Sequence, residues 1–83
     1  MRSENHFVIQ NASGNLLVLN IEPEAARFLV ANGQSVSVHE LYETQPVTVK
    51  LERSEDGETL ISIWPGDGNV RVEKDGKDVF DLV

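Results

Sequence analysis

Cysteine is absent from this chain of 83 residues, and histidine occurs only twice. Without cysteine no disulfide can form, and two histidines are too few for a zinc site of the usual Cys/His type. Small secreted domains often depend on such cross-links, so their absence favours a cytoplasmic location. Long apolar runs are absent as well. The polar residues 1–6 lead directly into the apolar residues 7–9, which predicts neither a secretory signal nor a membrane-spanning segment.

Basic residues are also few, with 7 Lys and Arg against 14 Asp and Glu, which gives a net charge of −7. Binding to nucleic-acid phosphates needs a basic face, so the composition excludes nucleic acid as a partner. The acidic residues are scattered rather than gathered in one block. They indicate a soluble, self-repelling surface, and the alternative is an acidic face that docks a basic partner.

Turn-forming residues, by contrast, recur along the whole chain, and the segments between them are short and rich in Val, Ile, Leu and Thr. This spacing is typical of an all-β domain. We therefore predict a single small antiparallel β-sandwich or partly open barrel of seven or eight short strands over residues 1–83. Residues 1–5 are expected to be disordered.

Local patterns assign several of these strands. Residues 7–10 and 16–21 flank a turn and are predicted to form a hairpin. Residues 47–53 alternate, with Val47, Val49 and Leu51 on one face and Lys50 and Glu52 on the other. Residues 59–64 are apolar on both faces, which indicates a central strand.

Near the C-terminus, Asp75-Gly76 suits a type I′ hairpin turn, because both central positions of that turn need positive φ. This hairpin would return the chain through Phe80 and Leu82.

The stretch IEPEAARFLVANGQSVSVHE, residues 21–40, admits two interpretations. A proline near its start, good helix formers and a glycine stop are typical of a short helix. Alternatively the stretch is a hairpin, in which a three-residue loop pairs Phe28 with Val36 and unites two apolar faces. We favour the strands. The alternative is an α+β fold with a short helix at about residues 23–32.

The pattern NASGNLLVLNIEPEAARFLVANGQSVSVHE … VTVKLE … ISIWPGDGNVRVEKDGKDV resembles a group of small bacterial proteins of unknown function. Its most specific elements are Glu22-Pro23 and Trp64-Pro65-Gly66. This chain departs from the group at Ala25 and Asn32, where the relatives commonly have glycine and proline. The resemblance implies a bacterial origin and an all-β fold, and it carries over no activity and no catalytic residues.

Trp64-Pro65-Gly66-Asp67-Gly68 is the most distinctive local sequence. The ordinary interpretation is that the only tryptophan fills the core, and the alternative is that it stacks on a sugar or anchors a partner. Asp67 and Asn69 do not continue into a calcium loop, because Arg71 stands where a further oxygen ligand belongs. They predict a turn whose side chains accept backbone hydrogen bonds.

The two histidines, His6 and His39, lie far apart in the sequence. A metal site would need Glu4 or Glu40 as further ligands, and an acid/base site would need His39 beside Glu40 and Glu43. Positions on the polar side of a strand account for the same residues. We therefore predict no catalytic residue, no metal, no cofactor and no enzymatic activity.

The predicted sheet edges give the clearest functional hypothesis, because unpaired N–H and C=O groups accept another strand. We predict a non-enzymatic interaction or structural module that binds a protein partner or a second copy of itself, with Tyr42 and Trp64 as candidate interface residues. Neither nucleic acid nor a membrane is an expected partner. The alternative is a small ligand-binding domain, for carbohydrate, with Trp64 as its platform.

Overall fold

The computed structural model describes residues 2–79, and within that range the chain contains strands and no α-helix. The strands are β1 (Ser3–Gln10), β2 (Leu17–Ile21), β3 (Ala26–Val30), β4 (Ser35–Tyr42), β5 (Thr48–Arg53), β6 (Thr59–Trp64), β7 (Asn69–Lys74) and β8 (Lys77–Asp78). The predicted all-β fold is confirmed.

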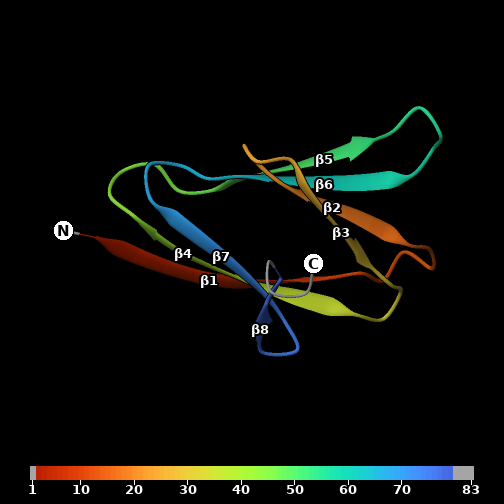
Figure 1. The fold of residues 1–83 in the computed structure, drawn as a ribbon, viewed down its shortest axis with the longest axis horizontal. Coiled ribbons are helices and arrows are strands. Elements are labelled where there is room, and N and C mark those ends of the chain that lie inside the picture. The colour runs from red at the N-terminus through yellow and green to blue at the C-terminus, as the bar shows by residue number, and fades with distance from the viewer. Residues whose placement is uncertain (1, 80–83) are drawn as a thin grey trace.

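The strands form two four-stranded sheets that enclose one core (Figure 1). Sheet A has the order β1-β4-β7-β8, and sheet B has the order β3-β2-β6-β5. Neither sheet closes on itself over the described residues, so the fold is a sandwich and not a barrel. Strand β6 lies between β2 and β5, which confirms that residues 59–64 are central.

One pairing departs from the predicted antiparallel arrangement. Strands β2 and β6 run parallel, with Leu17 beside Thr59 and Ile21 beside Ile63, whereas the other described pairs are antiparallel. A parallel pair needs a long connection instead of a tight turn, so no local sequence signal marks it.

Two of the predicted hairpins are wrong. Strand β1 pairs with β4 and β2 pairs with β3, so residues 7–10 and 16–21 lie in different sheets. Strands β3 and β4 also lie in different sheets, and Phe28 pairs with Leu19 instead of Val36. Turn residues mark where the chain reverses, but the apolar faces decide which strands pair.

A buried asparagine joins two of the connections that cross between the sheets, the one from β1 to β2 and the one from β3 to β4. Asn11 is 3% exposed, and its Nδ2 donates to the carbonyl oxygens of Asn15 and Val30, each at 2.8 Å. Its own backbone carbonyl oxygen accepts a 2.7 Å bond from the amide of Gly33. These bonds hold the ends of β1 and β3 side by side, in place of the predicted hairpin turns.

The structure decides between helix and strand for the ambiguous segment. Residues 22–25 form a turn in which Ala25 has a φ of 58°, and β3 follows directly. Along β3 the burial alternates, with Phe28 half-buried and Val30 buried while Arg27 and Leu29 are exposed. This period of two belongs to a strand, so the helix alternative is wrong.

The core lies between the sheets and is made almost entirely of branched aliphatic side chains. Sheet A contributes from β4 and β7, sheet B from β2, β3 and β6, and one residue follows β8. The buried members are Leu17, Leu19, Ile21, Val30, Val36, Val38, Ile63, Val72 and Val79. Each full burial of such a side chain contributes about 1.5–3 kcal/mol, which offsets part of the chain's ordering entropy.

At the N-terminus, β1 begins at Ser3, which pairs with Tyr42, so residues 3–5 are strand where disorder was expected. At the other end, Asp75 and Gly76 have φ of 53° and 78°, which confirms the predicted type I′ turn between β7 and β8. The predicted return through Phe80 and Leu82 lies outside the described residues.

Candidate interaction surface at the edge of sheet B

Among the described strands, β5 is the most exposed. Every one of its residues is exposed, and it lies at the outer edge of sheet B with β6 as its neighbour (Figure 1). An edge strand of this kind presents a row of N–H and C=O groups to solvent along its free side. Such a row is a ready acceptor for a further strand.

Two apolar residues of β5 face the core side of sheet B and still lie in solvent. Val49 pairs with Ile63 and Leu51 with Ile61, which both pack in or against the core. Directly opposed residues of an antiparallel pair share a face. Leu51 is nevertheless 74% exposed and Val49 43%. Within residues 2–79, sheet A therefore leaves the apolar face of β5 uncovered.

The opposite face of β5 is charged and contacts the tryptophan. Lys50 and Glu52 alternate with the apolar residues, and the Lys50 ammonium lies 5.3 Å from the ring centroid of Trp64. Trp64 ends β6 and is 39% exposed. The interpretation of Trp64 as a core residue is therefore wrong, and the ring and the ammonium form a cation–π pair at the surface.

Tyr42, the other candidate interface residue, lies elsewhere. It ends β4 in sheet A, is half-buried, and lines a depression of about 200 Å³ together with Arg2 and Asp67. Trp64 belongs to sheet B. The two residues therefore belong to different sheets, whereas Trp64 and β5 belong to the same sheet.

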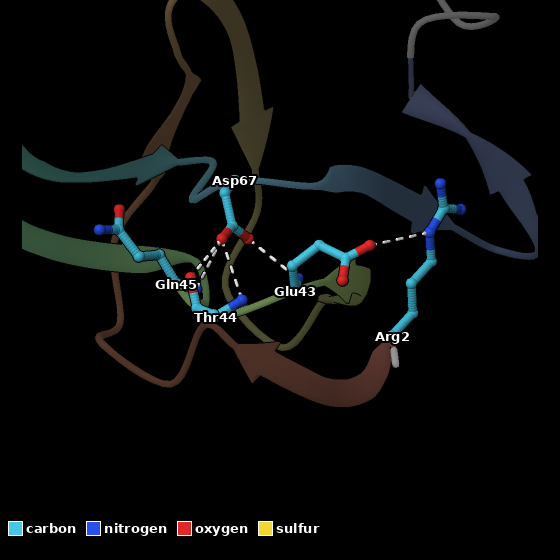
Figure 2. A network of polar contacts seen from close by, with 5 residues as sticks. All are labelled: Arg2, Glu43, Thr44, Gln45 and Asp67. Atoms are coloured by element: carbon cyan, nitrogen blue, oxygen red, sulfur yellow. Dashed lines mark hydrogen bonds and ion pairs between the residues drawn. The ribbon is translucent and has the colours of Figure 1, made fainter.

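A carboxylate fixes the loop that leads from sheet A towards β5. The oxygens of Asp67 accept hydrogen bonds from the amides of Glu43, Thr44 and Gln45 and from the Thr44 hydroxyl, at 2.7–3.1 Å (Figure 2). The bonds from Thr44 are the main reason that the pKa of Asp67 is lowered, to about 2. Glu43 in turn pairs with Arg2 at 3.5 Å. Asp67 thus accepts backbone hydrogen bonds as predicted, but from a loop distant in the sequence and not from its own turn.

Two glycines allow the chain to approach this loop closely. A Cβ on Gly66 would overlap the carbonyl oxygen of Gln45, and a Cβ on Gly68 would overlap the carbonyl oxygen of Leu41. Both obstacles are backbone atoms, which cannot turn aside as a side chain can. The segment between β6 and β7 therefore packs directly on the end of β4 and on the segment that follows β4.

A buried carboxylate fixes the entry to β5. Glu40 is 4% exposed, and its two oxygens accept bonds from the Asn5 side-chain amide at 2.9 Å and from the Val47 backbone amide at 2.6 Å. Val47 directly precedes β5. Glu40 thus joins β1, β4 and the start of β5, and both of its oxygens are occupied by donors of the fold.

The two histidines lie side by side on the outer face of sheet A. His6 and His39 are register partners, and their rings stack with centroids 4.2 Å apart. His39 Nε2 lies 2.7 Å from Glu73, which also binds Arg71 at 2.8 Å. These residues line a depression of about 580 Å³. The sequence did not indicate this stacking, because it depends on the pairing of β1 with β4.

The hypothetical acid/base and metal groupings do not assemble. Along β4 the buried Glu40 alternates with the half-exposed His39, so their side chains lie on opposite faces of sheet A. In the part of the chain that the structure describes, no group of three or more His, Asp or Glu side chains is arranged to hold a metal ion.

Comparison of the chain with protein-family models, curated proteins and solved structures finds no match. The resemblance to small bacterial β-proteins therefore stays a prediction. Among the described residues, no helix is long and apolar enough to cross a membrane.

Proposed function

We propose that the protein is a non-enzymatic interaction module that binds a partner by adding a strand to β5. The exposed apolar face of this edge strand carries the proposal, because Leu51 at 74% exposure lies in register with the core-packed residue Ile61. A partner strand would satisfy the free N–H and C=O groups of β5 and would cover Leu51 and Val49 at the same time.

The loops around β5 support the same proposal. Asp67 and Glu40 direct their oxygens at donors of the fold itself and hold the segment before β5 in place. A binding edge that is ordered before the partner arrives loses less entropy on association. We place this module in a bacterial cytoplasm, a proposal supported by the absence of cysteine and by the resemblance described above.

Amide hydrogen exchange tests this function directly. The free-edge amides of β5 should exchange rapidly in dilute protein, since solvent reaches them. They should become protected when a partner is present. The partner is supplied either by raising the protein concentration or by adding bacterial cell extract. Leu51→Lys should abolish the protection. Leu29→Lys is the matched control, because Leu29 is a 52% exposed leucine on β3, the opposite edge of sheet B. Rapid exchange of the β5 amides under every condition would rule out the proposal.

Carbohydrate binding is the second candidate, and the exposure of Trp64 at 39% favours it. The Lys50 ammonium, however, lies over the ring that a sugar would stack on. A fluorescence titration of Trp64 with a panel of mono- and oligosaccharides tests this candidate. A spectrum that no sugar changes would remove it.

A further inference from the structure

We propose that the partner of β5 is a second copy of the chain, paired antiparallel so that Leu51 lies opposite Leu51 of the other copy. This inference rests on the proposed function and specifies its partner. The two copies would be related by a twofold axis perpendicular to sheet B, as twofold symmetry is the commonest among homo-oligomers. Sheet B would then continue through the axis, with the two β5 strands at its centre.

The charges of β5 are self-complementary in this register. Lys50 and Glu52 flank Leu51 and share the charged face of the strand. When the two copies of Leu51 face each other, Lys50 of each copy lies directly opposite Glu52 of the other. Opposite charges at such cross-strand positions stabilise a pair of strands, and here the twofold axis makes the contact twice.

The neighbouring registers are disfavoured by the same residues. A perpendicular twofold axis keeps each residue on its own face, so the allowed registers are those centred on a residue. Centring on Lys50 would place Lys50 against Lys50, and centring on Glu52 would place Glu52 against Glu52. Like charges directly opposite each other are destabilising. Charge therefore favours the register centred on Leu51 over both of its immediate neighbours.

The apolar face supports this register as well. Leu51 is the most exposed large hydrophobic residue described, and in this register it packs against its own copy across the axis. Val49 of each copy lies two residue pairs further out, opposite Arg53, whose long aliphatic stem can cover it. The apolar strip that sheet A leaves uncovered would thus become the centre of the interface.

The other described edge strands lack such a pattern. Strand β3 contains no acidic residue, β8 has two residues, and β1 contains no lysine or arginine. Among the described edge strands, only β5 has an exposed apolar residue with a lysine on one side of it and a glutamate on the other.

Charge reversal tests the pairing. In a dimer of either Lys50→Glu or Glu52→Lys, like charges would oppose each other at both cross-strand pairs. We therefore expect each variant to have a dissociation constant at least tenfold higher than that of the wild type. Light scattering behind a sizing column measures these constants. Mixing the two variants should restore a heterodimer of near wild-type affinity, because position 50 of each copy then faces the opposite charge at position 52 of the other. Lys77→Glu and Glu24→Lys make the same changes in net charge away from β5 and should leave the wild-type dimer intact.

Cross-linking tests the register, since the chain has no cysteine of its own. Directly opposed residues have Cα atoms about 4.5–5.5 Å apart, which lies within disulfide range. Leu51→Cys should therefore oxidise to a covalent dimer. Val49→Cys is the matched control and should not, because in this register Val49 faces Arg53.

The experimental outcomes distinguish a failure of the dimer from a failure of strand addition to β5. A chain that stays monomeric at every concentration, while cell extract still protects the β5 amides, overturns the second copy as partner and leaves strand addition intact. The register is overturned if mixing Lys50→Glu with Glu52→Lys does not restore the dimer. It is also overturned if Val49→Cys forms a covalent dimer faster than Leu51→Cys does. A monomer whose β5 amides stay unprotected in extract overturns both proposals.

Discussion

At the residue scale, the most distinctive feature is the use of carboxylates as hydrogen-bond acceptors for backbone amides. Asp67 accepts from three consecutive amides of the loop after β4, and Glu40 accepts from the amide before β5. Bonds to an ionised acceptor are among the stronger ones in proteins. These two acids therefore order loops that contain little apolar surface.

The first prediction concerns pH. The pKa of Asp67 is lowered in the folded protein from 3.8 to about 2. The unfolded chain therefore binds the proton first, so the stabilisation by Asp67 is complete above pH 3.8 and is lost as the pH falls through about 2. We expect Asp67→Asn to lower the urea midpoint at pH 7 and to have little effect near pH 2.

Urea titrations of both proteins at several pH values between 7 and 2 check this prediction. Asp56→Asn serves as the control, since Asp56 lies exposed in the turn between β5 and β6. If the urea midpoints of Asp67→Asn and the wild type differ by the same amount at pH 7 and at pH 2, ionisation of Asp67 does not contribute to stability.

Glu40 gives the second prediction. Glu40→Ala removes the acceptor of the half-buried Val47 amide, at a cost of about 2 kcal/mol, whereas the exposed Asn5 side chain can turn to water. Glu40→Gln keeps one acceptor oxygen and should cost about 1 kcal/mol. Denaturant unfolding measures both. Equal losses for the two variants would mean that the charge, and not the number of acceptors, matters.

At the element scale, the segment between β6 and β7 depends on two glycines for reasons of space. We predict that Gly68→Ala destabilises the protein by about 3 kcal/mol, because the new Cβ meets the backbone of Leu41 and the two segments must separate. Gly57→Ala is the control. Gly57 has open space around it and a φ of 83°, so its variant should lose only about 1 kcal/mol, from backbone strain. Thermal unfolding of both variants measures the difference.

The sequence predicted single strands and turns well and the pairing of distant strands poorly. The apolar character of both faces at residues 59–64 and the Asp75-Gly76 turn correctly predicted a central strand and a hairpin, because both signals are local. The pairing of β1 with β4 and of β2 with β6 joins residues far apart in the chain, and no local pattern encodes it. The stacking of His6 on His39 follows from this pairing and was missed with it.

The candidate surface was missed for a related reason. The alternation of residues 47–53 correctly placed Val49 and Leu51 on one face of a strand. A pattern of this kind does not distinguish an apolar face that the opposite sheet covers from one that it leaves in solvent. Trp64 was selected as a candidate interface residue from the distinctive sequence around it, and the structure places it on the outer surface beside Lys50.

At the scale of the whole molecule, the two sheets do not cover each other completely. Strands β2 and β6 contribute to the buried core, whereas β5 on the same sheet is exposed throughout. If two copies join at β5, association is coupled to folding, and stability depends on protein concentration.

The fourth prediction follows from this coupling. We expect the Tm of the wild-type protein to rise by about 3–5 °C for each tenfold increase in concentration over the range where the dimer is populated. Leu51→Lys should remove this dependence and Leu29→Lys should keep it. Differential scanning calorimetry over a concentration series measures the slope. A wild-type Tm that does not change with concentration contradicts the dimer.

The parallel pairing of β2 with β6 has a consequence for the order of events on the ribosome. Strand β2 is synthesised early, but β6, one of its two neighbours in sheet B, emerges only after β3, β4 and β5. Until residue 63 has emerged from the ribosome, Leu19 and Ile21 cannot complete their sheet. Because such distant contacts form late and slowly, the nascent chain must carry these apolar residues in water for most of its synthesis.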